Sequence, residues 1–183
     1  MRLFIGIPLA PEVIDALART VHWLQSPDDG LRWTTAETWH ITLQFLGETS
    51  AQQFGCTMQR LGEIRAPQVP VWLDGTGFFD RAGVFFAGVN VSPELRHLQK
   101  QVVGATSQCG FVPEDRPYHP HVTLARAKGD KRMQALRKLK TKAGASAQFP
   151  AFTAAEFLLY EAFPGPGGSR YEVRGRFPLA GER

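Results

Sequence analysis

An internal duplication is the feature that most constrains the fold of this chain of 183 residues. The stretches WHITLQFLGE (Trp39–Glu48) and YHPHVTLAR (Tyr118–Arg126) share the pattern histidine, any residue, threonine, leucine. Each pattern follows a segment that begins with Pro-Glu. The two copies are offset by 82 residues at the prolines (11 and 93) and by 81 at the histidines (40 and 121). Such matched spacing indicates two repeats of one structural unit.

The two copies contain the same predicted elements in the same order. An apolar strand comes first, at residues 3–7 and 84–91, and an amphipathic helix with Pro-Glu in its first turn follows. A histidine-containing strand, a second helix and an aromatic-rich extended segment complete each copy. Turn sequences at residues 80–83 and 164–169 predict a hairpin after each copy.

Capping signals and apolar stripes place the predicted helices more closely. Ser50 and Gln53 form a possible capping box, and Asp130 is the expected N-cap of the corresponding helix in the second copy. The expected buried positions of the two Pro-Glu helices are Ile14, Leu17, Val21 and Leu24 in the first and Leu95, Leu98, Val102 and Ala105 in the second.

These elements predict an α+β fold that is bilobal and duplicated. Each lobe is expected to be a mostly antiparallel sheet with helices on its outer face, and an approximate two-fold axis relates the lobes across a central groove. We expect a single bilobal domain over residues 1–183, with repeats at 1–80 and 81–163 and a closing hairpin strand at 169–179.

The histidine patterns place polar side chains together within each strand. Side chains two positions apart in a β-strand point to the same face. His40 and Thr42 therefore share one face of the first strand, and His121 and Thr123 share one face of the second. With the apolar positions between them turned toward the helices, both polar pairs are expected to face the groove.

Two imidazoles and two hydroxyls around one point suit the cleavage of a phosphodiester. Histidine changes charge near neutral pH, so one imidazole can remove a proton and the other supply one, each transfer being worth roughly 10²–10⁴ in rate. Threonine hydroxyls can donate hydrogen bonds to the non-bridging oxygens of the phosphate. This scheme requires no metal and no cofactor.

The motifs and their flanks resemble the 2H phosphoesterase superfamily, in particular its RNA 2',3'-cyclic phosphodiesterase branch, also called 2'-5' RNA ligase. The resemblance rests on RWTTAETWH, HITL, FLGE and PHVTLAR, and it extends from MRLFIGI to the final hairpin. It implies hydrolysis of a terminal RNA 2',3'-cyclic phosphate to a 2'-phosphomonoester, and reversible, ATP-independent 2'-5' ligation. It further implies that His40 is the proton donor and His121 the proton acceptor, that Thr42 and Thr123 bind the phosphate, and that Arg126 binds substrate.

Two residues near the second pattern complicate this interpretation. Strict alternation would turn Arg126 away from the phosphate unless the strand twists or ends near Ala125. His119 lies two residues before His121, and with His40 these histidines could instead form a zinc site.

Other assignments stay open at the level of sequence. The chain could be a non-catalytic RNA-binding module, or a phosphodiesterase for another cyclic or 2'-5' linked nucleotide. The segment Arg126–Lys142 contains eight basic residues and one acid, which is typical of a solvated helix face or an RNA backbone track. Aromatic side chains that could either pack in the core or stack on a base are Phe4, Trp33, Trp39 and Phe45.

The resemblance implies a monomer whose partners are RNA ends or nucleoside 2',3'-cyclic phosphates. Composition favours a cytoplasmic protein without a membrane segment, and its basic charge permits an anionic partner without requiring one. The formal net charge is +4, and the N-terminal segment lacks the plan of a signal peptide. No apolar run reaches the length of a membrane span. Cys56 and Cys109 lie far apart without a CxxC pattern, so we expect both to be reduced, buried thiols.

Overall fold

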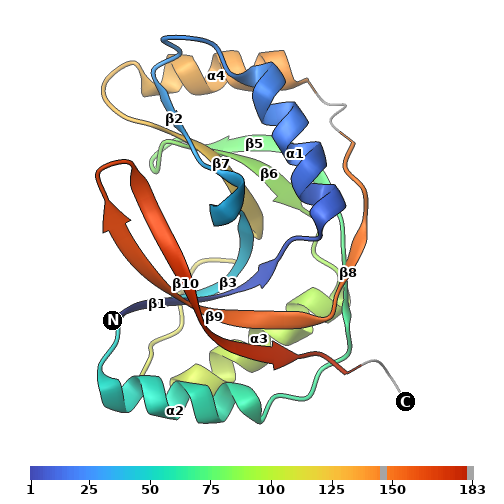
Figure 1. Ribbon diagram of the computed structural model, residues 1–183, viewed down its shortest axis with the longest axis vertical. Coiled ribbons are helices and arrows are strands. Elements are labelled where there is room, and N and C mark those ends of the chain that lie inside the picture. Colours follow the sequence, from blue (N-terminus) through green and yellow to red (C-terminus); the bar gives the residue numbers. More distant parts are fainter. Residues whose placement is uncertain (145–147, 181–183) are drawn as a thin grey trace.

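The computed structural model describes residues 1–144 and 148–180, and it confirms a bilobal α+β fold built on two four-stranded sheets (Figure 1). The strands of the first sheet, in spatial order, are β10 (Gly168–Pro178), β9 (Glu156–Gly165), β1 (Arg2–Pro8) and β3 (His40–Glu48). Those of the second are β2 (Leu31–Trp33), β7 (His121–Ala127), β6 (Val84–Val89) and β5 (Leu73–Phe79). A short third sheet pairs β4 (Val69–Val71) with β8 (Phe152–Ala154). All of these pairings are antiparallel.

Helices lie outside the two sheets, so the sheets form the middle of the molecule (Figure 1). The helices α2 (Ala51–Gly62) and α3 (Pro93–Ser107) contact each other and the first sheet. The helix α4 (Arg132–Ala143) contacts the second sheet, and α1 (Pro11–Leu24) packs beside it. A short 3₁₀ turn, η1 (Ala36–Thr38), precedes β3. No helix in residues 1–144 and 148–180 combines the length and the apolar content that a membrane span needs.

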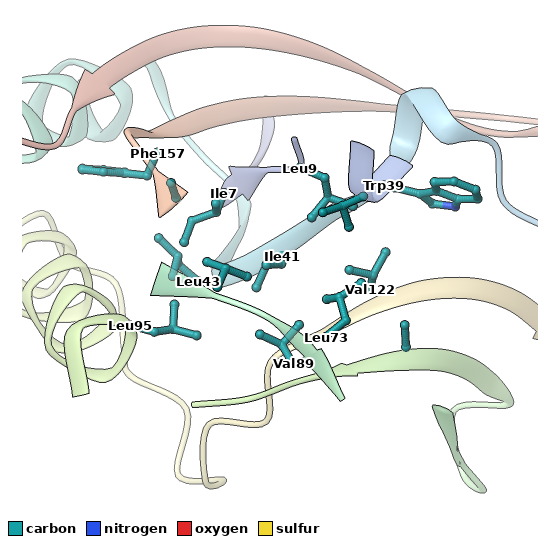
Figure 2. Packing of buried hydrophobic residues seen from close by; sticks show 14 of the residues in the cluster. Ile7, Leu9, Trp39, Ile41, Leu43, Leu73, Val89, Leu95, Val122 and Phe157 are labelled. Atoms are coloured by element: carbon teal, nitrogen blue, oxygen red, sulfur yellow. The ribbon is translucent and has the colours of Figure 1, made fainter. Parts of the chain in front are cut away.

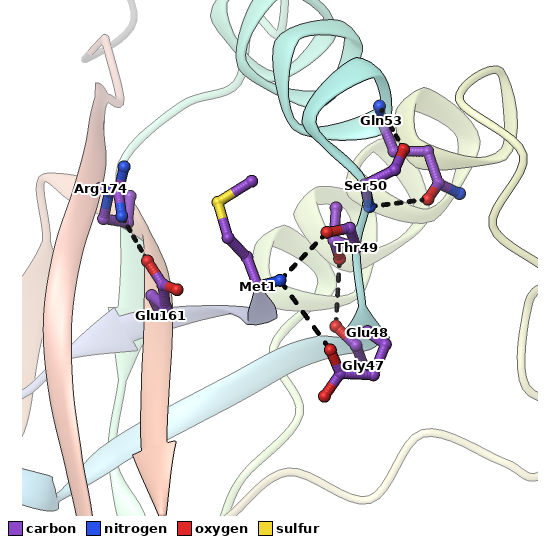
Figure 3. Close-up of polar contacts among 8 residues, drawn as sticks. All are labelled: Met1, Gly47, Glu48, Thr49, Ser50, Gln53, Glu161 and Arg174. Carbon is purple, nitrogen blue, oxygen red and sulfur yellow. Dashed lines mark hydrogen bonds and ion pairs between the residues drawn. The ribbon is translucent and has the colours of Figure 1, made fainter.

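Most local sequence signals match the observed elements. The Ser50–Gln53 capping box is present at the start of α2, where both reciprocal hydrogen bonds form (Figure 3). The expected face of α3 is buried throughout, and in α1 only Ile14 is left half-buried. Asp130 is not the N-cap of α4. Lys131 occupies the cap position without a side-chain hydrogen bond, and a turn with Gly129 at φ 83° precedes the helix.

The two sequence repeats exchange strands in space. The strand β5 belongs to the first repeat but pairs with β6 of the second, and β9 belongs to the second repeat but pairs with β1 of the first. Helices from both repeats likewise contact each other, since α1 packs beside α4 and α2 packs against α3. Each spatial lobe therefore contains elements of both repeats. This exchange supports the proposal that the chain is one bilobal domain.

One apolar core extends through both lobes between the sheets and their helices. Ile41 and Leu43 of β3 point into the same cluster as Val89 of β6, Leu95 of α3 and Val122 of β7 (Figure 2). The apolar residues of the two histidine strands are thus turned toward this core, as their alternation predicts. Burial of this kind is the main contribution to the stability of the fold.

Polar contacts anchor the far end of β3. The amino group of Met1 donates to the Thr49 carbonyl at 3.2 Å and lies 3.8 Å from the Glu48 carboxylate (Figure 3). On the neighbouring hairpin, Arg174 pairs with the largely buried Glu161. The Met1 contacts hold the end of β3 that lies opposite His40, and the Arg174–Glu161 pair joins β10 to β9 within the hairpin.

Cys56 and Cys109 form a disulfide, so the expectation of two reduced thiols is wrong. Cys56 lies on α2 and Cys109 follows α3, and their Cα atoms are 5.7 Å apart although 53 residues separate them in sequence. Local spacing gave no sign of the pair because the packing of α2 on α3 brings the two cysteines together.

Cys56→Ser is expected to lower the free energy of unfolding by about 2–4 kcal/mol, because the unfolded chain regains the freedom of a long closed loop. Thermal unfolding of the variant, and of the wild type with and without a reductant, measures the effect. The histidine strands should stay in place below the melting temperature, since the disulfide joins helices on the outer side of the first sheet. Two titratable thiols in the unreduced, denatured wild type would contradict the prediction.

Candidate active site

His40 is the first residue of β3, and backbone geometry fixes its tautomer. Its Nδ1 lies 2.7 Å from the Thr38 carbonyl, and its Nε2 lies 2.9 Å from the Thr42 hydroxyl. A carbonyl oxygen only accepts, so Nδ1 carries the proton in the neutral ring. In that state Nε2 accepts from Thr42, and when protonated it becomes a donor. Nε2 is therefore the atom available for proton transfer.

His121 repeats this arrangement at the start of β7. Its Nδ1 donates to the His119 carbonyl at 2.8 Å, which leaves Nε2 unprotonated in the neutral ring. Thr38 and His119 occupy equivalent positions in the two repeats, and both act through their main chain. Within the described residues no group hydrogen-bonds Nε2 of His121, in contrast to Nε2 of His40. The second histidine thus has the more open basic nitrogen.

Aromatic rings hold both histidines. The Phe4 ring lies 4.6 Å from the His40 ring between centroids, and the Phe86 ring lies 5.3 Å from that of His121. Tyr171 of β10 also packs edge-on against His40 at 5.4 Å. These neighbours restrict the imidazoles and exclude water from one side of each.

Burial lowers the pKa of both histidines below the usual value. The pKa of His40 falls to about 4, mainly through desolvation, and the positive charges of His121 and Arg126 lower it further while the Thr38 carbonyl opposes the change. Burial also lowers the pKa of His121, with contributions from His119 and Arg126. The effect of His121 on the pKa of His40 places the two rings within electrostatic reach of each other. Burial favours the neutral form of both rings in the free protein.

A β-bulge in β7 turns Arg126 toward the histidine face. Phe86 pairs with Thr123 and Phe85 with Ala125, so Leu124 is an extra residue in its strand. A bulge places two consecutive residues on one side and resets the alternation beyond it. Leu124 and Ala125 are both buried, and Arg126 is exposed on the side of Thr123. The expectation from strict alternation is therefore wrong.

The equivalent bulge occurs in β3 and exposes Phe45. Gly6 pairs with Thr42 and Ile5 with Gln44, so Leu43 is the extra residue. Gln44 faces α3, where its Oε1 accepts from the Thr106 hydroxyl at 2.7 Å. Phe45 is 61% exposed and occupies the position that Arg126 has in the second repeat. The two repeats thus present an aromatic ring and a cation at matching places.

The segment before His40 ties the two lobes together at the bulge of β7. The Thr34 hydroxyl lies 2.8 Å from the Thr123 carbonyl and 3.0 Å from that of Leu124, and its amide donates to the Leu124 carbonyl. The buried Trp39 indole donates to the Thr34 hydroxyl at 2.8 Å. Sequence reasoning did not predict that Thr34 and Trp39 connect the lobes. The polar run WTTAETW was the one local signal for it.

A reciprocal tie runs from the segment before His121. The Tyr118 hydroxyl donates to the Thr42 carbonyl at 2.9 Å, across 76 residues of sequence. Each histidine–threonine pair is thereby connected to the chain that precedes the other pair. The relative position of the two strands is set by these hydrogen bonds as well as by the core.

Other sequence candidates have separate places. His119 is exposed, and among the described residues no group of three or more histidine, cysteine, aspartate or glutamate side chains is arranged to hold a metal ion. Phe4 and Trp39 are buried, and Trp33 is half-buried with its indole bonded to Asp29. In the basic segment, Lys140 and Lys142 of α4 donate to backbone carbonyls of neighbouring elements.

The fold and the paired motifs define a bilobal protein of the 2H phosphoesterase class. The model of the 2'-5' RNA ligase superfamily matches residues 9–161, and the chain belongs to this superfamily. An RNA 2',3'-cyclic phosphodiesterase of Aeropyrum pernix is 40% identical over 112 residues, which cover 59% of this chain and just under two thirds (64%) of that protein. That of Escherichia coli is 32% identical over 128 residues, 68% of this chain and 71% of that protein.

Solved structures agree over nearly the whole chain. Escherichia coli LigT in complex with 3'-AMP superposes with a TM-score of 0.78 at 28% identity and covers 97% of both chains. The protein TT0787 of Thermus thermophilus superposes with a TM-score of 0.75 at 26% identity and covers 100% of both. The bilobal architecture is therefore that of the superfamily.

Proposed function

We propose that this protein hydrolyses terminal RNA 2',3'-cyclic phosphates to 2'-phosphomonoesters, with His40 as proton donor and His121 as proton acceptor. The observation that carries the proposal is the matched pair of Nδ1 to carbonyl hydrogen bonds, which leave both Nε2 atoms for chemistry. The relatives that are named RNA 2',3'-cyclic phosphodiesterase support the choice of substrate class. Both histidines belong to one chain, so the proposed site works in a monomer.

The proposed reaction is an in-line displacement at phosphorus. Nε2 of His121 takes a proton from water as the water oxygen bonds to phosphorus, and Nε2–H of His40 protonates the departing 3' oxygen. The phosphate stays on the 2' oxygen. Thr42 and Thr123 donate to the non-bridging oxygens, and Arg126 balances their charge. A 5'-hydroxyl in place of water would form a 2'-5' linkage, with the cyclic ester supplying the driving force that ATP supplies elsewhere.

The exposed ring of Phe45 fits the same proposal. An exposed aromatic ring beside the phosphate site can stack on the terminal base, an interaction worth roughly 1–3 kcal/mol per base. Of the four aromatic candidates, Phe45 has by far the most open ring, being 61% exposed. We therefore assign base stacking to Phe45 and phosphate contact to Arg126.

The decisive assay is incubation with adenosine 2',3'-cyclic phosphate, followed by chromatographic identification of the product. We expect 2'-AMP, and activity that survives a chelator. Formation of 3'-AMP would show the opposite orientation of attack. Binding of RNA without any turnover would leave only a non-catalytic RNA-binding module.

The pH dependence follows from the two lowered histidine pKa values. The profile of kcat/KM reports the free protein, in which one imidazole must be charged and the other neutral, so it should be bell-shaped with its maximum below pH 6.5. A bound phosphate anion favours imidazolium and raises both pKa values, so the kcat maximum should lie at higher pH. A monotonic profile, or a kcat/KM maximum above about pH 7, would contradict the assignment.

Arg126→Gln should shift the kcat/KM profile to higher pH, because the Arg126 cation lowers the pKa of both histidines. Arg126→Lys keeps the charge and is the matched control, for which we expect little shift. Both variants lose the guanidinium fork and should bind substrate less tightly. The comparison therefore separates the charge from the hydrogen-bond geometry.

A further inference from the structure

A groove of about 930 Å³ has Arg126 in its wall. Its walls include Arg32 and Trp33 of β2, Lys128 just beyond β7, and Pro166 in the turn between β9 and β10. The groove is therefore shared by one residue of the proposed catalytic site, Arg126, and by the turn of the β9–β10 hairpin. In Figure 1, β2 and the end of β7 lie on the side of the molecule toward which this hairpin extends.

Arg32 faces the same side of the second sheet as Arg126. The two are direct partners in the antiparallel pairing of β2 with β7, and directly opposed residues project from the same face. The positive charges of both act on Tyr171, whose ring packs against His40. Arg32 thus lies at the rim of the site, across from β10.

The basic residues of the groove have no acidic partners in the described part of the chain. Ion pairs that involve Arg32, Arg126 or Lys128 are absent there. Like charges directly opposite each other on a sheet destabilise it. A facing pair of arginines without carboxylates is therefore a place where a bound anion removes an existing repulsion.

The nearby acids have other roles or positions. Asp29 accepts from the Leu31 amide at 3.0 Å, the Trp33 indole at 2.8 Å and the Ser26 amide at 3.2 Å, so its carboxylate shapes the loop before β2. Asp28 also lines the groove, in the same loop. On the paired strands β2 and β7 the charged side chains beside this groove are Arg32 and Arg126.

We propose that Arg32 and Lys128 bind the phosphodiester on the 5' side of the terminal nucleotide, so that the preferred substrate is an oligoribonucleotide end and not a mononucleotide. The inference rests on the proposed function for the position of the cyclic phosphate. With that phosphate at His40 and His121, Arg126 lies between it and Arg32. The next phosphate along the RNA then contacts the guanidinium group of Arg32. Guanidinium binds phosphate oxygens in pairs, which suits a fixed subsite.

The test compares kcat/KM for a trinucleotide that ends in a 2',3'-cyclic phosphate with kcat/KM for adenosine 2',3'-cyclic phosphate. The wild type should prefer the trinucleotide, and Arg32→Gln should reduce the ratio about tenfold, the loss expected for one charge-assisted contact. Arg96→Gln, which removes an exposed arginine from α3 outside the groove, is the matched control and should leave the ratio unchanged.

Salt dependence gives a second readout. For single strands, each phosphate contact contributes about −0.7 to the slope of log affinity against log salt concentration. Binding of a trinucleotide that ends in a 2'-phosphate should lose about that much slope in Arg32→Gln. A purely structural role of Arg32 would not change the salt slope.

The outcomes separate this inference from the proposed function. Equal ratios in wild type and Arg32→Gln, with equal salt slopes, would overturn the second phosphate site even if cyclic phosphates are hydrolysed. If neither substrate is turned over, the proposed function fails, and the binding arm alone then decides whether Arg32 recognises the 5' phosphate of an RNA end.

Discussion

His121→Ala is expected to lower kcat for adenosine 2',3'-cyclic phosphate by about 10²–10⁴-fold, since the attacking water loses its general base. The His121 side chain is half-buried at a strand end and lies outside the main core, so the fold should survive. Steady-state kinetics with circular dichroism and thermal unfolding of the same preparation measure both properties.

His119→Ala is the matched control for this prediction. It removes a neighbouring imidazole but keeps the backbone carbonyl that holds Nδ1 of His121. We expect it to retain most of the wild-type activity, and its activity also tests the zinc alternative, in which His119 would be a ligand. Wild-type kcat in His121→Ala, or loss of activity in His119→Ala with the fold intact, would refute the assignment of the base.

Thr123→Val is expected to lower kcat by about 10²–10³-fold, the effect of removing one preorganised donor to an oxyanion. Valine has nearly the same shape and is equally suited to a strand, so the change removes little besides the hydroxyl. The Thr123 carbonyl still accepts from Thr34, so the bulge should remain in place.

Thr123→Ser restores the hydroxyl and should recover much of the lost activity. Thr42→Val should have a comparable effect with one difference, because the Thr42 hydroxyl also lies 2.9 Å from Nε2 of His40. We therefore expect its pH profile to change as well, whereas that of Thr123→Val should not. Near wild-type turnover in both valine variants would show that the threonines are only strand residues.

The periodicity of the sequence was sufficient to predict the bilobal fold and the paired strands. Apolar residues alternate with polar ones in HIT and HVT, and the observed burial follows this alternation up to Leu43 and Leu124. Beyond those residues strict alternation fails at Arg126, because a bulge depends on the register with the neighbouring strand, which the pattern within one strand does not contain.

The sequence also did not predict that β5 and β9 each pair with a strand of the other repeat. A repeat predicts which elements occur, but the choice of pairing partner depends on how a strand's edge and twist fit the rest of the sheet. The disulfide between Cys56 and Cys109 has the same origin, since it forms where α2 packs on α3.

The sequence by itself determined the chemical groups of the site, because the spacing of histidine and threonine within a strand fixes which side chains share a face. Only the tertiary structure decided what those groups can do. Packing against Phe4 and Phe86 desolvates the imidazoles, the carbonyls of Thr38 and His119 select the tautomer, and the two bulges add Phe45 and Arg126 to the same face. Each of these effects depends on the path of the main chain or on contacts between residues that are distant in sequence, and a local pattern encodes neither.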